Sequence, residues 1–134
     1  MKIKKLLPLT ITLGCLLLSA PVIAGDIYVI TNHSLTINAA DIRDVFIGDK
    51  QIVGSVKVVP IDNASLQNEF LSKVVKMDAN KYASIWTKKG FRDGLNPPAV
   101  KSSDAEVAAA VKSTPGAVAY VSTLPQGVNL VQKF

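Results

Sequence analysis

The chain contains 134 residues, of which 49% are apolar, with 15 basic and 10 acidic side chains and a single cysteine. This length supports one ordinary domain, and the composition is too apolar and too weakly charged for a disordered chain. A single cysteine excludes a small scaffold held together by disulfides. The formal charge of +5 would suit a nucleic-acid-binding protein, so the position of the basic residues decides how that charge is interpreted.

Residues 1–24 have the pattern of a secretory signal peptide. Three lysines among the first five residues precede an apolar stretch over residues 6–18, and Val22 and Ala24 place short side chains three residues and one residue before a cleavage site. A retained membrane anchor is the alternative, but the apolar stretch is shorter than the roughly 20 residues that span a bilayer. We therefore expect cleavage after Ala24 and export to the periplasm.

The cysteine leaves a second alternative, which is a lipoprotein anchored at Cys15. Lipid attachment requires a cysteine at the cleavage site, and Cys15 lacks the usual leucine three positions upstream, where Thr12 stands. Six further apolar residues also separate Cys15 from the end of the segment. Lipidation is therefore the minor alternative.

Removal of the signal changes the charge and redox character of the chain. The exported chain, residues 25–134, has 110 residues and contains no cysteine. Its 12 basic and 10 acidic side chains give a net charge of +2. No basic run with interleaved aromatic residues remains to follow a phosphodiester backbone, so we expect no nucleic-acid partner. No later apolar run is long enough to cross a bilayer, so we expect no stable membrane insertion after cleavage.

The first half of the exported chain predicts two strand–helix units. A β-branched and aromatic run predicts a strand over residues 26–31, and Asn38 is expected to cap a helix that Gly48 ends. The apolar face of that helix comprises Ile42, Val45 and Phe46. A second strand is expected over residues 56–61, closed by Pro60, which lacks an N–H for the ladder. Asn63 or Ser65 would cap the next helix, whose apolar positions are Leu66, Phe70, Val74 and Met77.

The second half predicts two further helices and two strands. Asp78 is expected to begin a helix that ends at Gly90, with Tyr82, Ile85 and Trp86 on its buried face, and residues 90–99 are expected to form a loop. Residues 103–106 match a capping box, and Pro115-Gly116 ends the helix that follows. Residues 117–122 read as a strand covered on both faces, and residues 128–131 as a shorter last strand. The pattern predicts an α/β domain in which helices outnumber strands.

Few residues offer catalytic or metal-binding chemistry. His33 is the only histidine in the chain, and a catalytic role would require a nucleophile or acid partner to which the sequence does not point. One histidine without cysteines cannot supply the usual zinc ligand sets, and no phosphate-binding or nucleophile-elbow motif occurs. We expect no enzyme, no metal and no cofactor.

The turn after the second strand offers a different chemistry, based on backbone N–H groups. Such groups at a helix N-terminus attract anions, and ligands of open α/β sheets bind at the carboxyl ends of the strands. Asn63 and Ser65 could each add a donor there. The same residue types also serve as plain helix caps, so capping and anion binding both remain open for this turn.

The order of several motifs matches a known family. The motifs run through Phe46-Ile47-Gly48, Val58-Val59-Pro60, Phe70, Trp86, Phe91, Gly94, Pro97-Pro98 and Pro115-Gly116-Ala117-Val118-Ala119-Tyr120-Val121. This order resembles the periplasmic substrate-binding proteins of phosphate ABC transporters, in particular their short single-lobe relatives, over nearly all of residues 26–134. The resemblance implies that residues 25–134 form a single lobe of a type II periplasmic-binding-protein-like fold, with a small mixed sheet flanked by helices.

The resemblance also implies a ligand and partners. A full family member closes two lobes around an anion, whereas this chain corresponds to little more than one lobe. The family carries an Arg and a Ser-Gly-Thr run before the phenylalanine that matches Phe70, whereas residues 62–70 contain no Arg and no Gly. Ser65 is the hydroxyl that matches. The implied ligand is phosphate or another oxyanion at Asn63 and Ser65, and the implied partner is an ABC transporter permease or another periplasmic protein.

Two functions follow from these expectations. The first is an exported, non-enzymatic domain that binds phosphate or a related oxyanion for transport. The second is a protein–protein interaction module that keeps the scaffold without binding phosphate. Its interface would use the surface that a second lobe would otherwise cover, with Ile47, Ile52, Val53, Leu95 and Pro97-Pro98 as candidates. The aromatic residues Phe46, Phe70, Tyr82, Trp86, Phe91 and Tyr120 are expected to lie in the core.

Overall fold

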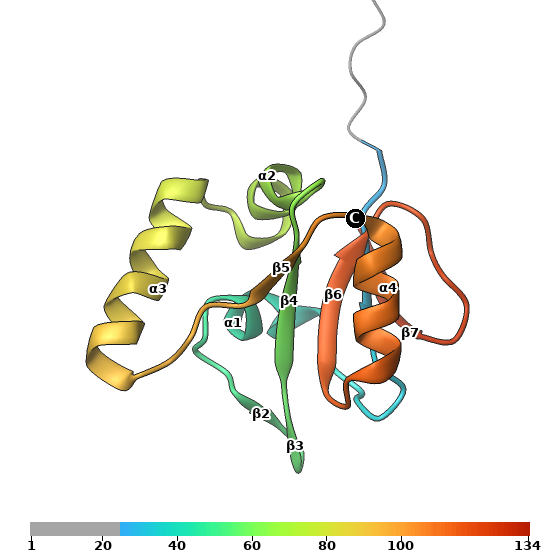
Figure 1. The fold of residues 1–134 in the computed structure, drawn as a ribbon, viewed down its shortest axis with the longest axis horizontal. Helices are drawn as coiled ribbons and strands as arrows, with labels where there is room; N and C mark the ends of the chain where they lie inside the picture. Colours follow the sequence, from blue (N-terminus) through green and yellow to red (C-terminus); the bar gives the residue numbers. More distant parts are fainter. Residues whose placement is uncertain (1–24) are drawn as a thin grey trace, which may run out of the picture.

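The computed structural model describes residues 25–134 (Figure 1). The predicted signal peptide over residues 1–24 lies outside the described residues. Within residues 25–134, each helix is too short or too polar to cross a bilayer.

A five-stranded mixed sheet forms the centre of the fold, in the order β5-β4-β6-β1-β7. Strands β4 and β5 are parallel, as are β4 and β6, whereas β1 runs antiparallel to both β6 and β7. The strands span Tyr28–Thr31 (β1), Val59–Asn63 (β4), Ala99–Lys101 (β5), Ala117–Val121 (β6) and Asn129–Lys133 (β7). The prediction of a small mixed sheet flanked by helices is therefore confirmed.

The remaining elements surround this sheet (Figure 1). Strands β2 and β3 form a short hairpin, and helical segments lie in the connections between the strands of the sheet. The bounds are Ile52–Val53 (β2), Val56–Lys57 (β3), Ala39–Asp41 (η1, a 3-10 helix), Ile42–Phe46 (α1), Gln67–Phe70 (α2), Leu71–Val75 (η2, a π-helix), Ala79–Asp93 (α3) and Asp104–Ser113 (α4). Among residues 25–134 the strands outnumber the α-helices, so the prediction that helices outnumber strands is wrong.

Each face of the sheet carries its own apolar cluster, because successive strand residues point to opposite faces. Helix α4 covers one face through Val107 and Val111, which pack against Ile30, Ile61 and the small residues of β6. The larger cluster lies on the other face, where α1 and η2 pack against the sheet. Every residue of β6 is buried, which confirms the prediction of a central strand covered on both sides.

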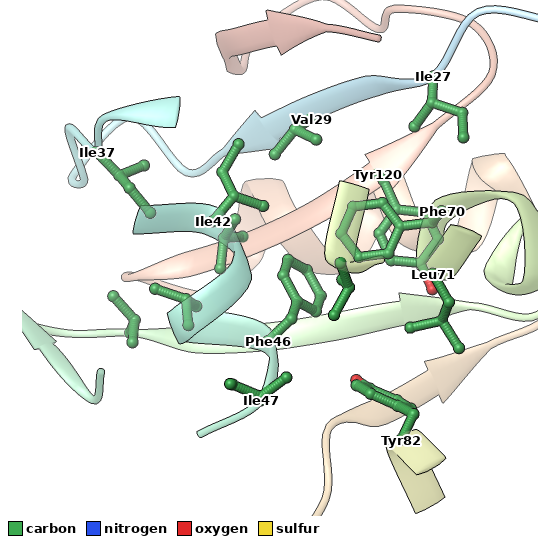
Figure 2. Packing of buried hydrophobic residues seen from close by; sticks show 14 of the residues in the cluster. Ile27, Val29, Ile37, Ile42, Phe46, Ile47, Phe70, Leu71, Tyr82 and Tyr120 are labelled. Atoms are coloured by element: carbon green, nitrogen blue, oxygen red, sulfur yellow. The ribbon is translucent and has the colours of Figure 1, made fainter. Parts of the chain in front are cut away.

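Three aromatic rings form the middle of the larger cluster (Figure 2). The rings of Phe70 and Tyr120 stack with centroids 3.8 Å apart and an interplanar angle of 3°, and Phe46 meets Phe70 edge-on at 4.7 Å. Edge-on aromatic pairs, such as Phe46 with Phe70, stabilise a core beyond the area they bury. The predicted burial of Phe46, Phe70 and Tyr120 is confirmed.

Phe91 departs from the core prediction. Its side chain is 90% exposed, because α3 continues past Gly90 to Asp93 and ends at Gly94, whose φ is +67°. At 100° per residue, the five positions between Trp86 and Phe91 turn Phe91 away from the buried face of the helix. The prediction that the helix ends at Gly90 is wrong for the same reason, since one glycine is tolerated inside a helix.

The strand predicted over residues 56–61 is divided and displaced. It separates into β3 and β4, and β4 continues through Pro60 to Asn63. In β4, Val59 donates its N–H at 2.9 Å to the carbonyl of Gly116, the residue before β6. Because alternate residues of a parallel strand bond to opposite neighbours, the backbone nitrogen of Pro60 faces β5. Pairing with β5 begins only at Ile61. Proline is therefore accommodated inside the strand, and its predicted role in closing the strand is wrong.

Helix capping agrees with the sequence at two of four positions. The Asp78 carboxylate accepts from the N–H of Lys81 at 2.8 Å, and the Ser103 hydroxyl accepts from the N–H of Glu106 at 3.3 Å, as predicted. Asn38 precedes η1 without a side-chain cap. The residue before α2 is Leu66, which has no side-chain cap either, so neither Asn63 nor Ser65 caps that helix.

Candidate functional site

Three parallel strands end at the same edge of the sheet. Asn63 at the end of β4 pairs with Lys101 at the end of β5, and β6 ends nearby at Val121. Helix α4 begins just after β5, with Asp104 as its first residue. This edge is where ligands of open α/β sheets bind, and it contains the predicted anion-binding pair of Asn63 and Ser65.

The structure brings Asn63 and Ser65 together and uses their donors within the chain. Asn63 Nδ2 donates to Asp104 Oδ1 at 2.8 Å and to the carbonyl of Tyr120 at 3.0 Å. Ser65 donates to Asn63 Oδ1 through its N–H at 3.1 Å and its Oγ at 2.6 Å. The two side chains therefore fix the turn after β4, and the fully buried Asn63 ties that turn to β6 and α4.

Asp104 lies at the centre of this edge, and the sequence gives no sign of that position. Its Oδ2 accepts from the N–H of Ser122 at 3.0 Å, the hydroxyl of Ser122 at 2.6 Å and the N–H of Thr123 at 3.2 Å, while its Oδ1 accepts from Asn63. Burial opposes ionisation, but the hydrogen bonds from Ser122, Asn63 and Thr123 outweigh it and hold the pKa of Asp104 below its usual value. The Asp104 carboxylate thus accepts hydrogen bonds from a cluster of donors that could otherwise bind an external anion.

A second carboxylate, Asp62, precedes Asn63 in β4, and its side chain points to the opposite face of the sheet. Its side chain is 1% exposed and accepts hydrogen bonds from Tyr82 Oη at 2.9 Å and Tyr120 Oη at 2.7 Å. Burial raises the pKa of Asp62, against the opposing effect of these hydrogen bonds. Burial and the nearby Asp62 also raise the pKa of both tyrosines, so both hydroxyls stay protonated and remain donors.

The raised pKa of Asp62 predicts a specific pH dependence of stability. The folded state holds the carboxyl proton of Asp62 more tightly than the unfolded state does. Asp62 therefore contributes stability below its unfolded pKa of 3.8, and this contribution is lost as the pH rises through its folded pKa. We expect Asp62→Asn to gain stability relative to the parent as the pH rises from 4 to 8. Urea denaturation at each pH measures the difference in free energy of unfolding between the two proteins. Because both proteins contain Asp104, its contribution cancels in this difference. A difference that stays constant with pH would contradict the assignment.

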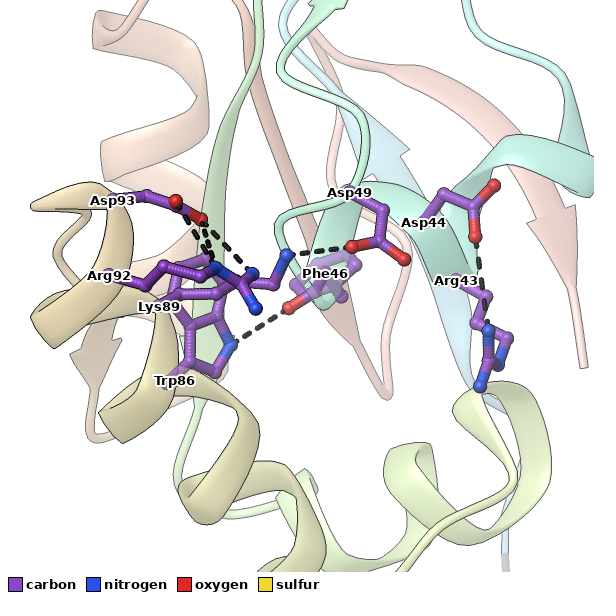
Figure 3. Close-up of polar contacts among 8 residues, drawn as sticks. All are labelled: Arg43, Asp44, Phe46, Asp49, Trp86, Lys89, Arg92 and Asp93. Carbon is purple, nitrogen blue, oxygen red and sulfur yellow. Dashed lines mark hydrogen bonds and ion pairs between the residues drawn. The ribbon is translucent and has the colours of Figure 1, made fainter.

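Helix α3 stands beside the sheet and is held by polar contacts to α1 and the turn after it (Figure 3). The indole Nε1 of Trp86 donates to the carbonyl of Phe46 at 3.1 Å, and Lys89 Nζ forms an ion pair with Asp49 Oδ1 at 2.7 Å. The Trp86 ring also packs against Gly48, where an added Cβ would lie 2.8 Å from it. These contacts anchor one side of α3 and leave the side facing β5 open.

An open groove of about 640 Å³ lies between α3 and β5. Asp62 and Tyr82 lie within it, and α3 lines it with the short side chains of Ala83 and Thr87 and with Gly90. Phe91 of α3 and Val100 of β5 also line it, and these side chains are 90% and 56% exposed. Two large apolar side chains thus reach solvent at one groove, which is the arrangement expected of an interaction surface.

The residues that the sequence predicted for an interface are divided between surface and core. Ile52 and Pro97 are exposed, and Leu95 and Val53 are half-buried, whereas Ile47 and Pro98 are buried. Leu95 and Pro97-Pro98 line the groove beside α3, but Ile47 belongs to the large apolar cluster. Its assignment to an exposed interface is therefore wrong.

His33 lies in the exposed turn after β1. Among residues 25–134, no three His, Asp or Glu side chains come together in an arrangement that could hold a metal ion. Asp62, Asp104 and the two tyrosines that contact Asp62 are among the residues whose pKa departs from its usual value.

Comparisons with known proteins leave the site to be interpreted from its own geometry. No protein-family model matches the chain, and no curated protein matches it with significant similarity. The features of the described residues that bear on function are therefore the donors around Asp104 and the groove between α3 and β5.

Proposed function

We propose that this chain is an exported, non-enzymatic protein-interaction domain on a single lobe of a type II periplasmic-binding-protein-like scaffold. The mixed sheet, the three parallel strands that end at one edge and the helix that begins there support the scaffold assignment. The order of sequence motifs supports the relation to phosphate transporter binding proteins. The partner would be an ABC transporter permease or another periplasmic protein.

The observation that carries the proposal is the position of Asp104. In an oxyanion-binding lobe, the N–H groups and hydroxyls at this edge would be free for the ligand. Here four donors from Asn63, Ser122 and Thr123 already bind the Asp104 carboxylate. A phosphate would have to displace an internal carboxylate, which weakens any such binding. The exposed apolar groove supports a protein partner instead.

Calorimetric titration of residues 25–134 with inorganic phosphate tests the proposal. We expect no heat of binding at phosphate concentrations up to 10 mM, and no rise in melting temperature, because a bound ligand stabilises the folded state by mass action. Saturable binding by the parent protein would contradict the proposal and favour the alternative below.

Oxyanion binding is the second candidate, and the convergence of donors on one carboxylate favours it. If Asp104 occupies an anion site, Asp104→Ala should open that site for phosphate. We expect the melting temperature of Asp104→Ala to rise with phosphate, by the equivalent of about 1.4 kcal/mol when phosphate is tenfold above its Kd. Asp104→Asn is the matched control, because its amide fills the same space and should leave the protein unresponsive. Equal responses from both variants would show that the site is not at Asp104.

A further inference from the structure

Strand β5 presents an unpaired backbone edge toward the groove. Lys101 directs its carbonyl toward β4, where it accepts from the N–H of Ala64 at 2.8 Å. Because alternate residues of a parallel strand bond to opposite neighbours, the N–H and C=O of Val100 point away from β4. No strand follows β5 in the sheet, so among residues 25–134 these two groups face no strand partner. They can pair with an added strand.

The opposite wall of the groove leaves room for a backbone. Ala83, Thr87 and Gly90 line it from α3, and their small size allows a chain to lie close to the helix. Phe91 and Val100 supply exposed apolar surface. The groove therefore combines strand-edge hydrogen bonds with an apolar contact, which is how extended peptides are recognised at sheet edges.

The two elements that flank the groove carry mostly basic side chains, with five basic residues and one acidic residue, Asp93, between Ala79 and Lys101. Asp62 also lines the groove, but it is 1% exposed and both of its oxygens already accept from tyrosine hydroxyls. Lys89 pairs with Asp49, and Arg92 pairs with Asp93. The other three, Lys81, Lys88 and Lys101, have no carboxylate within ion-pair distance in the described part of the chain. Like charges would oppose the pairing of two copies at this surface, whereas an acidic segment would be attracted.

We propose that the groove between α3 and β5 binds an extended segment of a partner protein, in which a large apolar residue is flanked by Asp or Glu. The segment adds to the sheet as a strand outside β5, with its backbone paired to Val100. Its apolar side chain contacts Phe91, and its carboxylates face Lys88 and Lys101. This proposal rests on the proposed interaction function and adds the chemistry and mode of binding of the partner.

Selection from a random nine-residue peptide library on phage tests the proposal, with residues 25–134 as target. Synthetic copies of the enriched peptides are then titrated against the parent, Val100→Pro and Val100→Thr. Val100→Pro removes the outward N–H and leaves the bonds to β4 in place, since proline is tolerated on edge strands. Val100→Thr keeps the N–H and the β-branched shape, and circular dichroism confirms that both variants fold.

The expected result is enrichment of acidic peptides with a central apolar residue, whose Kd rises at least tenfold on Val100→Pro and changes less than threefold on Val100→Thr. Binding should also weaken from 50 to 500 mM NaCl, because the lysines are exposed. Enrichment of neutral or basic peptides, binding equal in the two variants, or a dimer of residues 25–134 that buries Phe91 would overturn the proposal. A protein partner captured equally well by the parent and Val100→Pro would overturn this mode of binding and leave the interaction function standing.

Discussion

Tyr120→Ala is expected to unfold the domain or bring it to the limit of its stability. The substitution removes a fully buried ring that stacks on Phe70 and contacts Phe46 edge-on, and such changes cost about 3–5 kcal/mol. It also removes a hydrogen bond from the buried Asp62 carboxylate, which adds about 1–3 kcal/mol. Domains of this kind have a total stability of about 5–15 kcal/mol. Urea denaturation followed by far-UV circular dichroism measures the loss.

Tyr120→Phe is the matched control for that experiment. It keeps the ring and its stacking on Phe70 and removes only the hydroxyl that binds Asp62. We expect a loss of about 1–3 kcal/mol, because the buried carboxylate keeps its second hydrogen bond, from Tyr82. Equal losses in Tyr120→Ala and Tyr120→Phe would mean that the ring stacking contributes nothing.

Trp86→Ala is expected to cost about 3–5 kcal/mol, the usual range for removing a large buried aromatic side chain. Trp86 is 7% exposed, packs against Gly48 and donates to the carbonyl of Phe46. Its loss would remove the contacts of α3 with Phe46 and Gly48. The amides of α3 should therefore also lose protection against hydrogen exchange.

Phe91→Ala on the same helix supplies the comparison for Trp86→Ala. Its side chain is 90% exposed, and surface substitutions change stability by about 0.5 kcal/mol or less. Thermal melts of the two variants should therefore separate clearly. A parent-like melt for Trp86→Ala, or a large loss for Phe91→Ala, would contradict the orientation of α3.

The elements with strong local patterns could be predicted from the sequence. The apolar run of β6, the serine cap of α4 and the aspartate cap of α3 depend on neighbouring residues, so their prediction needs no tertiary information. Strand β5 could not be predicted, because three residues between Pro98 and Ser102 are too few to show a period. Its place is set by pairing with β4.

The site was only partly predictable for a related reason. The turn at Asn63 and Ser65 is recognisable from residue types at a strand end. The role of Asp104 depends on Ser122 and Thr123, which are distant in sequence and reach it only because β6 ends beside α4. Phe91 could have been placed correctly from its spacing to Trp86, had the helix been extended past Gly90.

Site-specific photocrosslinking in expressing cells is the decisive measurement for the proposed protein-interaction function. A photoreactive amino acid replaces Phe91 in one protein and the exposed Leu124, outside the groove, in another. We expect a discrete adduct with a partner protein from position 91 and none from position 124. No adduct at position 91, or equal adducts at both positions, would contradict it.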